Sequence, residues 1–253
     1  ATIMRVAWKY SGQSYVVLGA LAALLHALWA FGARRAFALF GVASSLALGV
    51  ELLGTSTGFP FGSYAYTTLL GYRILDLVPY AIPISWFYML YCALALCGRI
   101  LSPPNGSRGV WLWSVVAGAV LTAWDVAMDP AMVHTSHWVW SERGVFYGMP
   151  LTNWIGWFVT GTLIARAMLA VVPPWRISER THREALPLVL YGVNGIMPIA
   201  ICLRDGLWWA AALGAAAMAL PLTLALRSSQ RRVNVPGVLT AGSRIYADAA
   251  RRG

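Results

Sequence analysis

About seven apolar stretches follow one another along the chain, each close to the ~20 residues that a helix needs to cross a bilayer. Only short polar pieces separate them, which indicates one compact bundle of membrane helices. The sequence therefore predicts an all-α, polytopic transmembrane fold with residues 1–226 as a single helical domain. The predicted spans are Ser14 to Phe31, Ala36 to Gly54, Leu77 to Gly98, Val110 to Met132, Pro150 to Val172, Leu186 to Cys202 and Gly206 to Leu226.

The composition excludes a water-soluble globule. Hydrophobic residues make up 59% of the chain and charged residues 11%, whereas soluble domains carry about a quarter charged residues. The first apolar stretch has the position of a secretory signal, but it lacks a small-residue cleavage site and is followed at once by Arg34 and Arg35. We expect it to be a retained helix.

The net charge of +10 arises mostly in loops and tails, where it reports orientation rather than a nucleic-acid partner. With an odd number of spans, five of the 19 basic residues fall on the N-terminal side of the membrane, namely Arg5, Lys9, Arg73, Arg143 and Arg204. The others fall on the opposite side. The positive-inside rule then predicts an outside N-terminus, a cytoplasmic C-terminus and a basic cytoplasmic tail over residues 227–253 that contacts lipid headgroups.

Acidic residues are costly inside a membrane, so each one is a candidate functional group. Glu51, Asp76, Asp125 and Asp129 are all predicted near the outer ends of their spans. Asp125 lies deepest and is expected to matter most, whereas Asp76 could simply cap a helix or pair with an arginine.

Asp125 and Asp129 are four residues apart and therefore share one helix face. Two carboxylates at this spacing cannot both ionise cheaply in a medium of low dielectric constant. One of them is expected to keep its proton at neutral pH, which makes the pair an acid/base couple. Pro130 follows directly and disfavours helical geometry at Asp129, so the helix is predicted to end there.

Two connecting segments, residues 57–66 and 138–154, mix turn formers with aromatic residues on the side predicted to hold the acids. They fit either an interfacial aromatic belt or a lid over the acids. The four histidines are too few and too scattered for a metal site. The three cysteines have no CxxC spacing and are expected to be buried apolar residues.

At these residues the chain resembles the carotenoid 1,2-hydratases of the CruF type, within a family of prokaryotic carotenoid biosynthesis membrane proteins. The resemblance covers roughly residues 45–165. It rests on Glu51 with Gly54, on the run Thr57 to Tyr64, on Trp124-Asp125-Val126-Ala127-Met128-Asp129-Pro130, on Trp138 and Trp140, and on the run Tyr147 to Trp157.

The resemblance implies acid-catalysed addition of water across the terminal C1–C2 double bond of an acyclic carotenoid end group, giving a tertiary alcohol. The proton would come from the Asp125/Asp129 pair, and Glu51 would act as base or orient the water. The residues expected to bind the substrate or to donate hydrogen bonds are Phe61, Tyr64, Tyr66, Trp138, Trp140, Asn153 and Trp154.

The same resemblance implies partners and a location. The substrates would be water and lycopene, a monocyclic carotene or a related carotenoid with an acyclic end, and the enzyme would need no cofactor. It would lie in the cell membrane of a prokaryote. Small residues spaced four apart, such as Gly161 and Ala165, suit helix packing and are equally compatible with a homo-oligomer.

Other functions for a seven-span protein can be compared with the same residues. A retinal receptor needs a lysine inside the bundle, and the single lysine, Lys9, precedes the first span. A di-iron hydroxylase needs many more histidines. A carotenoid cyclase remains open, because ring closure begins with the same protonation. A non-catalytic lipid or proton transporter also remains open, although a relay needs polar residues through both membrane halves and the inner half offers little beyond Asn194.

The predicted orientation can be tested with reporter fusions. A reporter fused after Arg227 is expected to be active only in the cytoplasm, and one at Ser141 only outside, because most arginines lie on the C-terminal side. The reverse pattern would contradict the assignment of the acids to the outer half of the bundle.

Overall fold

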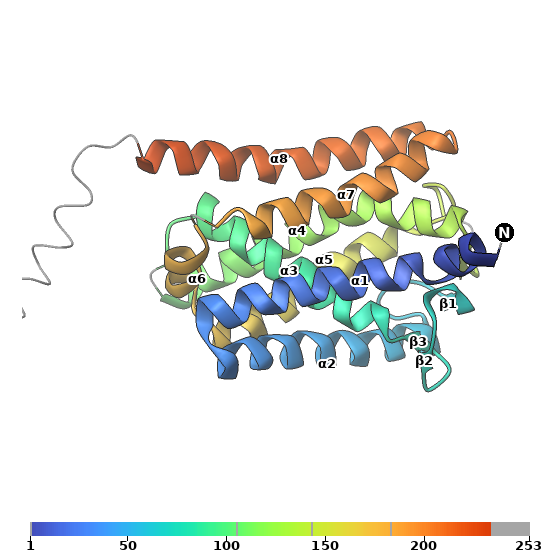
Figure 1. Ribbon diagram of the computed structural model, residues 1–253, viewed down its shortest axis with the longest axis horizontal. Coiled ribbons are helices and arrows are strands. Elements are labelled where there is room, and N and C mark those ends of the chain that lie inside the picture. Colours follow the sequence, from blue (N-terminus) through green and yellow to red (C-terminus); the bar gives the residue numbers. More distant parts are fainter. Residues whose placement is uncertain (1, 105, 143, 183, 234–253) are drawn as a thin grey trace, which may run out of the picture.

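The computed structural model describes residues 2–104, 106–142, 144–182 and 184–233. Within them the helices and strands follow the order shown in Figure 1. The elements are α1 (Thr2–Phe31), α2 (Ala33–Thr57), β1 (Tyr64–Tyr66), the 3-10 helix η1 (Thr68–Leu70), β2 (Arg73–Ile74), β3 (Val78–Pro79), α3 (Ala81–Ile100), α4 (Gly106–His134), β4 (Trp138–Trp140), α5 (Leu151–Val171), α6 (Pro174–Thr181), α7 (Leu186–Arg204) and α8 (Trp208–Val233).

Seven of the eight described α-helices, all except α6, are long and apolar enough to cross a membrane. The predicted all-α, polytopic bundle of seven spans is therefore confirmed. The helices extend past the apolar runs at several ends, since α1 begins at Thr2 and α8 continues to Val233. The predicted tail thus begins as helix, and its residues 234–253 lie outside the described part of the chain.

Two predicted boundaries were wrong, and both involve proline. The third span does not begin at Leu77, because Val78 precedes a proline and adopts the extended geometry that this position favours, so α3 starts only at Ala81. The helix that contains the fourth span does not end at Asp129, as Pro130 had suggested, because α4 continues through Pro130 to His134. Packing against neighbouring helices outweighs the local preference there, as is common in membrane helices.

Helix α3 is the centre of the bundle. Every residue from Ser85 to Arg99 is buried, and α3 packs against α1, α2, α4, α6, α7 and α8. A helix that is apolar on all sides can be enclosed by its neighbours without burying many polar groups. The remaining spans surround it and turn their larger apolar residues outward, as Leu18, Ile155 and Ile196 do with exposures of 64, 63 and 64%.

Helices α4 and α5 approach each other closely at Gly118. A Cβ atom at this position would lie 2.9 Å from the carbonyl oxygen of Phe158 and 2.9 Å from the backbone nitrogen of Thr162. The absent side chain lets the two backbones meet, which is the usual role of small residues between membrane helices.

All of the strands lie at one end of the bundle, near the first residues of α1, and α6 lies at the other end (Figure 1). β1 pairs with β4 in an antiparallel ribbon, and β2 pairs with β3 in a separate hairpin. The β1–β4 ribbon joins the segment after α2 to the segment after α4, so the two aromatic loops singled out in the sequence cover the same end of the bundle.

Gly118→Val is expected to lower the folded yield of the protein. The added atoms meet backbone rather than a flexible side chain, and such overpacking costs about 1–3 kcal/mol. Gly41→Val is the control, because a Cβ atom at Gly41 meets nothing within 4 Å. Yield after detergent extraction and the midpoint of thermal unfolding would measure the effect, and equal behaviour of the two variants would contradict the close contact.

Candidate active site

Three carboxyl groups come together at the end of the bundle that carries the ribbon. Glu51 of α2 and Asp125 and Asp129 of α4 have exposures of 2, 0 and 2%. The fourth candidate, Asp76, does not join them, because it is exposed in the turn of the β2–β3 hairpin with a φ of 57°. The prediction that all four acids belong to the outer ends of membrane spans was therefore wrong for Asp76.

Glu51 accepts three hydrogen bonds. The hydroxyls of Tyr64 and Tyr66 donate to Oε2 at 2.5 and 2.8 Å, and Trp86 Nε1 donates to Oε1 at 3.1 Å. Burial, together with the adjacent glutamate, raises the pKa of both tyrosines above the ordinary value. The phenols therefore keep their protons and act as donors.

The two aspartates of α4 have different surroundings. Trp138 Nε1 donates to Asp129 Oδ1 at 2.7 Å, and Trp140 Nε1 donates to Oδ2 at 3.4 Å. Asp125 receives one hydrogen bond, from Asn153 Nδ2 to Oδ2 at 3.2 Å, and its Oδ1 has no hydrogen-bond partner among the described residues. A buried oxygen left unpaired in this way suits a group that handles a proton.

The β1–β4 ribbon supplies four of these donors. Its register sets Tyr64 opposite Trp140 and Tyr66 opposite Trp138, so all four side chains lie on the buried face of the ribbon. The tyrosines of β1 bond to Glu51, and the tryptophans of β4 bond to Asp129. One short ribbon thus holds carboxyl groups from two different helices.

A cavity of about 730 Å³ lies beside these groups. Glu51 and Asp129 line it, and Asp125 lies behind the wall, one helical turn deeper. Six of the predicted binding residues line the cavity, namely Phe61, Tyr64, Tyr66, Trp138, Trp140 and Asn153. Trp154 does not line it and packs against Phe146, with the ring centroids 5.0 Å apart.

Sequence reasoning gave no role to several residues of the cavity wall. Trp157 stacks on Trp86 with the ring centroids 4.4 Å apart, and both Trp157 and Trp124 line the cavity. Trp157 follows Asn153 by four residues, and this helical spacing could have placed it on the same face. Trp86 carried no such signal, because α3 is apolar on every side.

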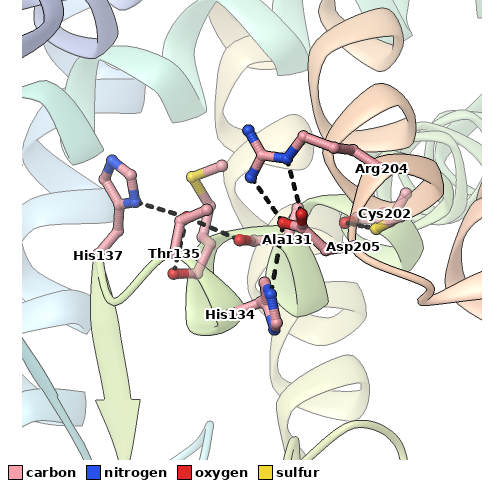
Figure 2. A network of polar contacts seen from close by, with 9 residues as sticks. Ala131, His134, Thr135, His137, Cys202, Arg204 and Asp205 are labelled. Atoms are coloured by element: carbon pink, nitrogen blue, oxygen red, sulfur yellow. Dashed lines mark hydrogen bonds and ion pairs between the residues drawn. The ribbon is translucent and has the colours of Figure 1, made fainter.

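A second cluster of polar residues lies at the cavity, and three of its members, Thr135, His137 and Arg204, line the cavity wall. Figure 2 shows the contacts: Thr135 Oγ1 lies 2.9 Å from His137 Nδ1, Arg204 donates to both oxygens of Asp205 at 2.6 and 2.7 Å, and His134 approaches Asp205 at 3.4 Å. The hydrogen bond from Arg204 lowers the pKa of Asp205. Burial lowers the pKa of His137, so its imidazole is neutral at pH 7.

The fold and the site define a multi-pass membrane protein whose buried carboxyl groups and aromatic rings surround an apolar cavity. The chain belongs to the carotenoid biosynthesis protein family, whose sequence profile matches residues 11–221. The family predicted from the motifs is therefore confirmed.

One curated relative is a bisanhydrobacterioruberin hydratase of Haloarcula japonica. It is 32% identical to this chain over 130 residues, which cover 51% of this chain and 43% of the relative. The matched region thus spans less than half of the relative's length. No solved structure matches the chain.

Proposed function

We propose that this protein is a membrane-embedded carotenoid hydratase, which adds water across the terminal C1–C2 double bond of an acyclic end group and gives a tertiary alcohol. The observation that carries the proposal is an aromatic cavity with two carboxyl groups on its wall, Asp129 and Glu51. An alkene end group needs apolar surroundings, and its hydration needs one acid and one base. The hydratase name of the relative supports the same reaction.

The first step assigned to the site is protonation of the alkene carbon that becomes a methylene. The proton comes from the Asp125/Asp129 pair. Asp125 holds it, because its Oδ1 has no hydrogen-bond partner among the described residues, and Asp129, which lines the cavity, passes it to the alkene. Asp125 does not touch the substrate in this scheme. It shares the proton with its neighbour one turn away and so acts as a positioning residue.

The second step is capture of the tertiary cation by water. Glu51 accepts the proton that the water loses, since its three hydrogen bonds all come from donors and suit a carboxylate. The proton then returns to the aspartate pair through solvent. Proton addition, water addition and proton loss balance without electron transfer, so the reaction requires no redox cofactor.

The rings around the cavity serve the cation between these two steps. Tyr64, Tyr66, Trp138 and Trp140 lie within one ribbon on the cavity wall. An aromatic ring face attracts a cation by about 0.5–2 kcal/mol. Trp154, which lies outside the cavity wall, has no part in this role.

The proposed reaction is tested by expressing the full chain in cells that accumulate lycopene, grown without oxygen and in water enriched in heavy oxygen. The expected product is heavier than the substrate by one water and carries the label. Label from molecular oxygen would end the hydratase proposal. A product of unchanged mass would indicate a cyclase instead, and unchanged lycopene would leave a transporter as the better reading.

Asp129→Asn, Asp125→Asn and Glu51→Gln are each expected to reduce turnover by about 10²- to 10⁴-fold, the usual contribution of a general acid or base. The side chains keep their size, so the folded yield should stay near normal. Asp76→Asn is the matched control, because Asp76 is exposed and asparagine tolerates its positive φ. Turnover in isolated membranes, normalised to folded protein, is the measurement. An Asp129→Asn variant with normal turnover would contradict the assignment.

A further inference from the structure

Part of the cavity wall is made by α1 and α7. Tyr15 and Val16 of α1 and Met197 and Ala200 of α7 line it there, and we call these four residues the mouth. Both helices run along the bundle (Figure 1), and they make little direct contact with each other, since each packs mainly against other helices. Ala200 is exposed, whereas residues deeper in the cavity, such as Trp124, are buried.

The surface around the mouth is apolar. Leu18 of α1 is 64% exposed, and Val193 and Ile196 of α7 are 44 and 64% exposed. In a chain that crosses the bilayer, exposed apolar residues in the middle of a span face lipid. The mouth therefore opens sideways toward lipid.

Few polar contacts link the two helices that form the mouth. Across the described parts of α1 and α7, the hydrogen bond that links them is the one from the Tyr15 hydroxyl to the Val193 carbonyl, at 3.3 Å. This length lies beyond the range of strong hydrogen bonds between oxygens. A small sideways movement of either helix would break it.

Helix α7 contains a proline beside the mouth, which makes it easier to bend there. Pro198 lies inside the helix, between Met197 and Ala200, and has no amide hydrogen for the carbonyl of Asn194. That carbonyl accepts a hydrogen bond from Trp124 Nε1 at 3.0 Å instead. A missing backbone hydrogen bond is a common cause of helix bending, and here it lies beside the mouth.

We propose that the carotenoid enters the cavity sideways from the bilayer between α1 and α7, and that the polyene stays in the mouth while the end group reacts. This inference rests on the proposed function. A conjugated polyene is a long apolar rod of which only the end must reach Glu51 and Asp129. The hydrogen bond between Tyr15 and Val193 holds α1 and α7 together at this entrance. The size of the side chain at position 200 determines how wide the entrance can open.

The first test narrows the mouth. Ala200→Trp is compared with Val189→Trp, which lies on the same face of α7 about three turns away, is 55% exposed and does not line the cavity. The substrates are lycopene and β-farnesene, which carry the same terminal alkene. Only lycopene has to extend through the mouth during the reaction.

Ala200→Trp is expected to lower the ratio of kcat/KM for lycopene to that for β-farnesene at least tenfold, whereas Val189→Trp leaves the ratio within twofold of the unmodified protein. An unchanged ratio in Ala200→Trp would overturn the proposal. A change of the same size in Val189→Trp would also overturn it, because the effect would then not belong to the mouth.

The second test does not depend on turnover. Ala200→Cys and Val189→Cys variants are treated with a lipid-soluble maleimide in membranes with and without lycopene. The three native cysteines are buried and serve as the background. Lycopene is expected to slow labelling of Ala200→Cys only. Protection at this position in a protein that forms no hydrated product would reject the hydratase function and keep the entrance. Normal turnover without protection would reject the entrance alone.

Discussion

The structure depends on the hydrogen bonds that satisfy Glu51 and Asp129 in the interior of the helical bundle. An unpaired buried polar group costs about 1–3 kcal/mol, and a buried carboxylate costs more. Five donors to these two residues come from aromatic side chains, whose rings are apolar and are favourably buried in the interior. These residues therefore shield the acids from lipid, and four of them, all except Trp86, also line the cavity. This is why segments between spans, which usually serve only as connections, fold back into the bundle in this protein.

The number and class of the helices could be predicted from the sequence because the signal is local. A run of apolar residues long enough to cross the bilayer leaves the backbone few alternatives to a helix. Boundaries were less predictable, since they depend on neighbours that the sequence does not name. Pro130 has the same local preference as Pro79, yet α4 continues through Pro130 and α3 begins only after Pro79. Tertiary packing decided between the two outcomes.

In the candidate site, too, some residues could be predicted from local sequence signals, whereas others depend on tertiary contacts. Helical spacing and the high cost of buried charge pointed to Asp125 and Asp129, and the structure shows both buried on α4. The pairing of β1 with β4 joins residues more than seventy positions apart, and no spacing rule reaches that far. Trp86 and Tyr15 were missed for a related reason, because an aromatic residue in an apolar helix gives no sign of which neighbour it will meet. Asp76 was misplaced because its segment turns back before the third span begins.

The register of the β1–β4 ribbon has a consequence for how this protein can change in evolution. Side chains alternate between the two faces of a strand, so one residue inserted or deleted between the two aromatic donors of either strand would place them on opposite faces of the ribbon. Loops usually vary freely in length in membrane proteins. In these two segments, the length can therefore vary only outside the paired strands. The β2–β3 hairpin, which carries none of the donors, is where additional residues can accumulate without disturbing the distance between Glu51 and Asp129.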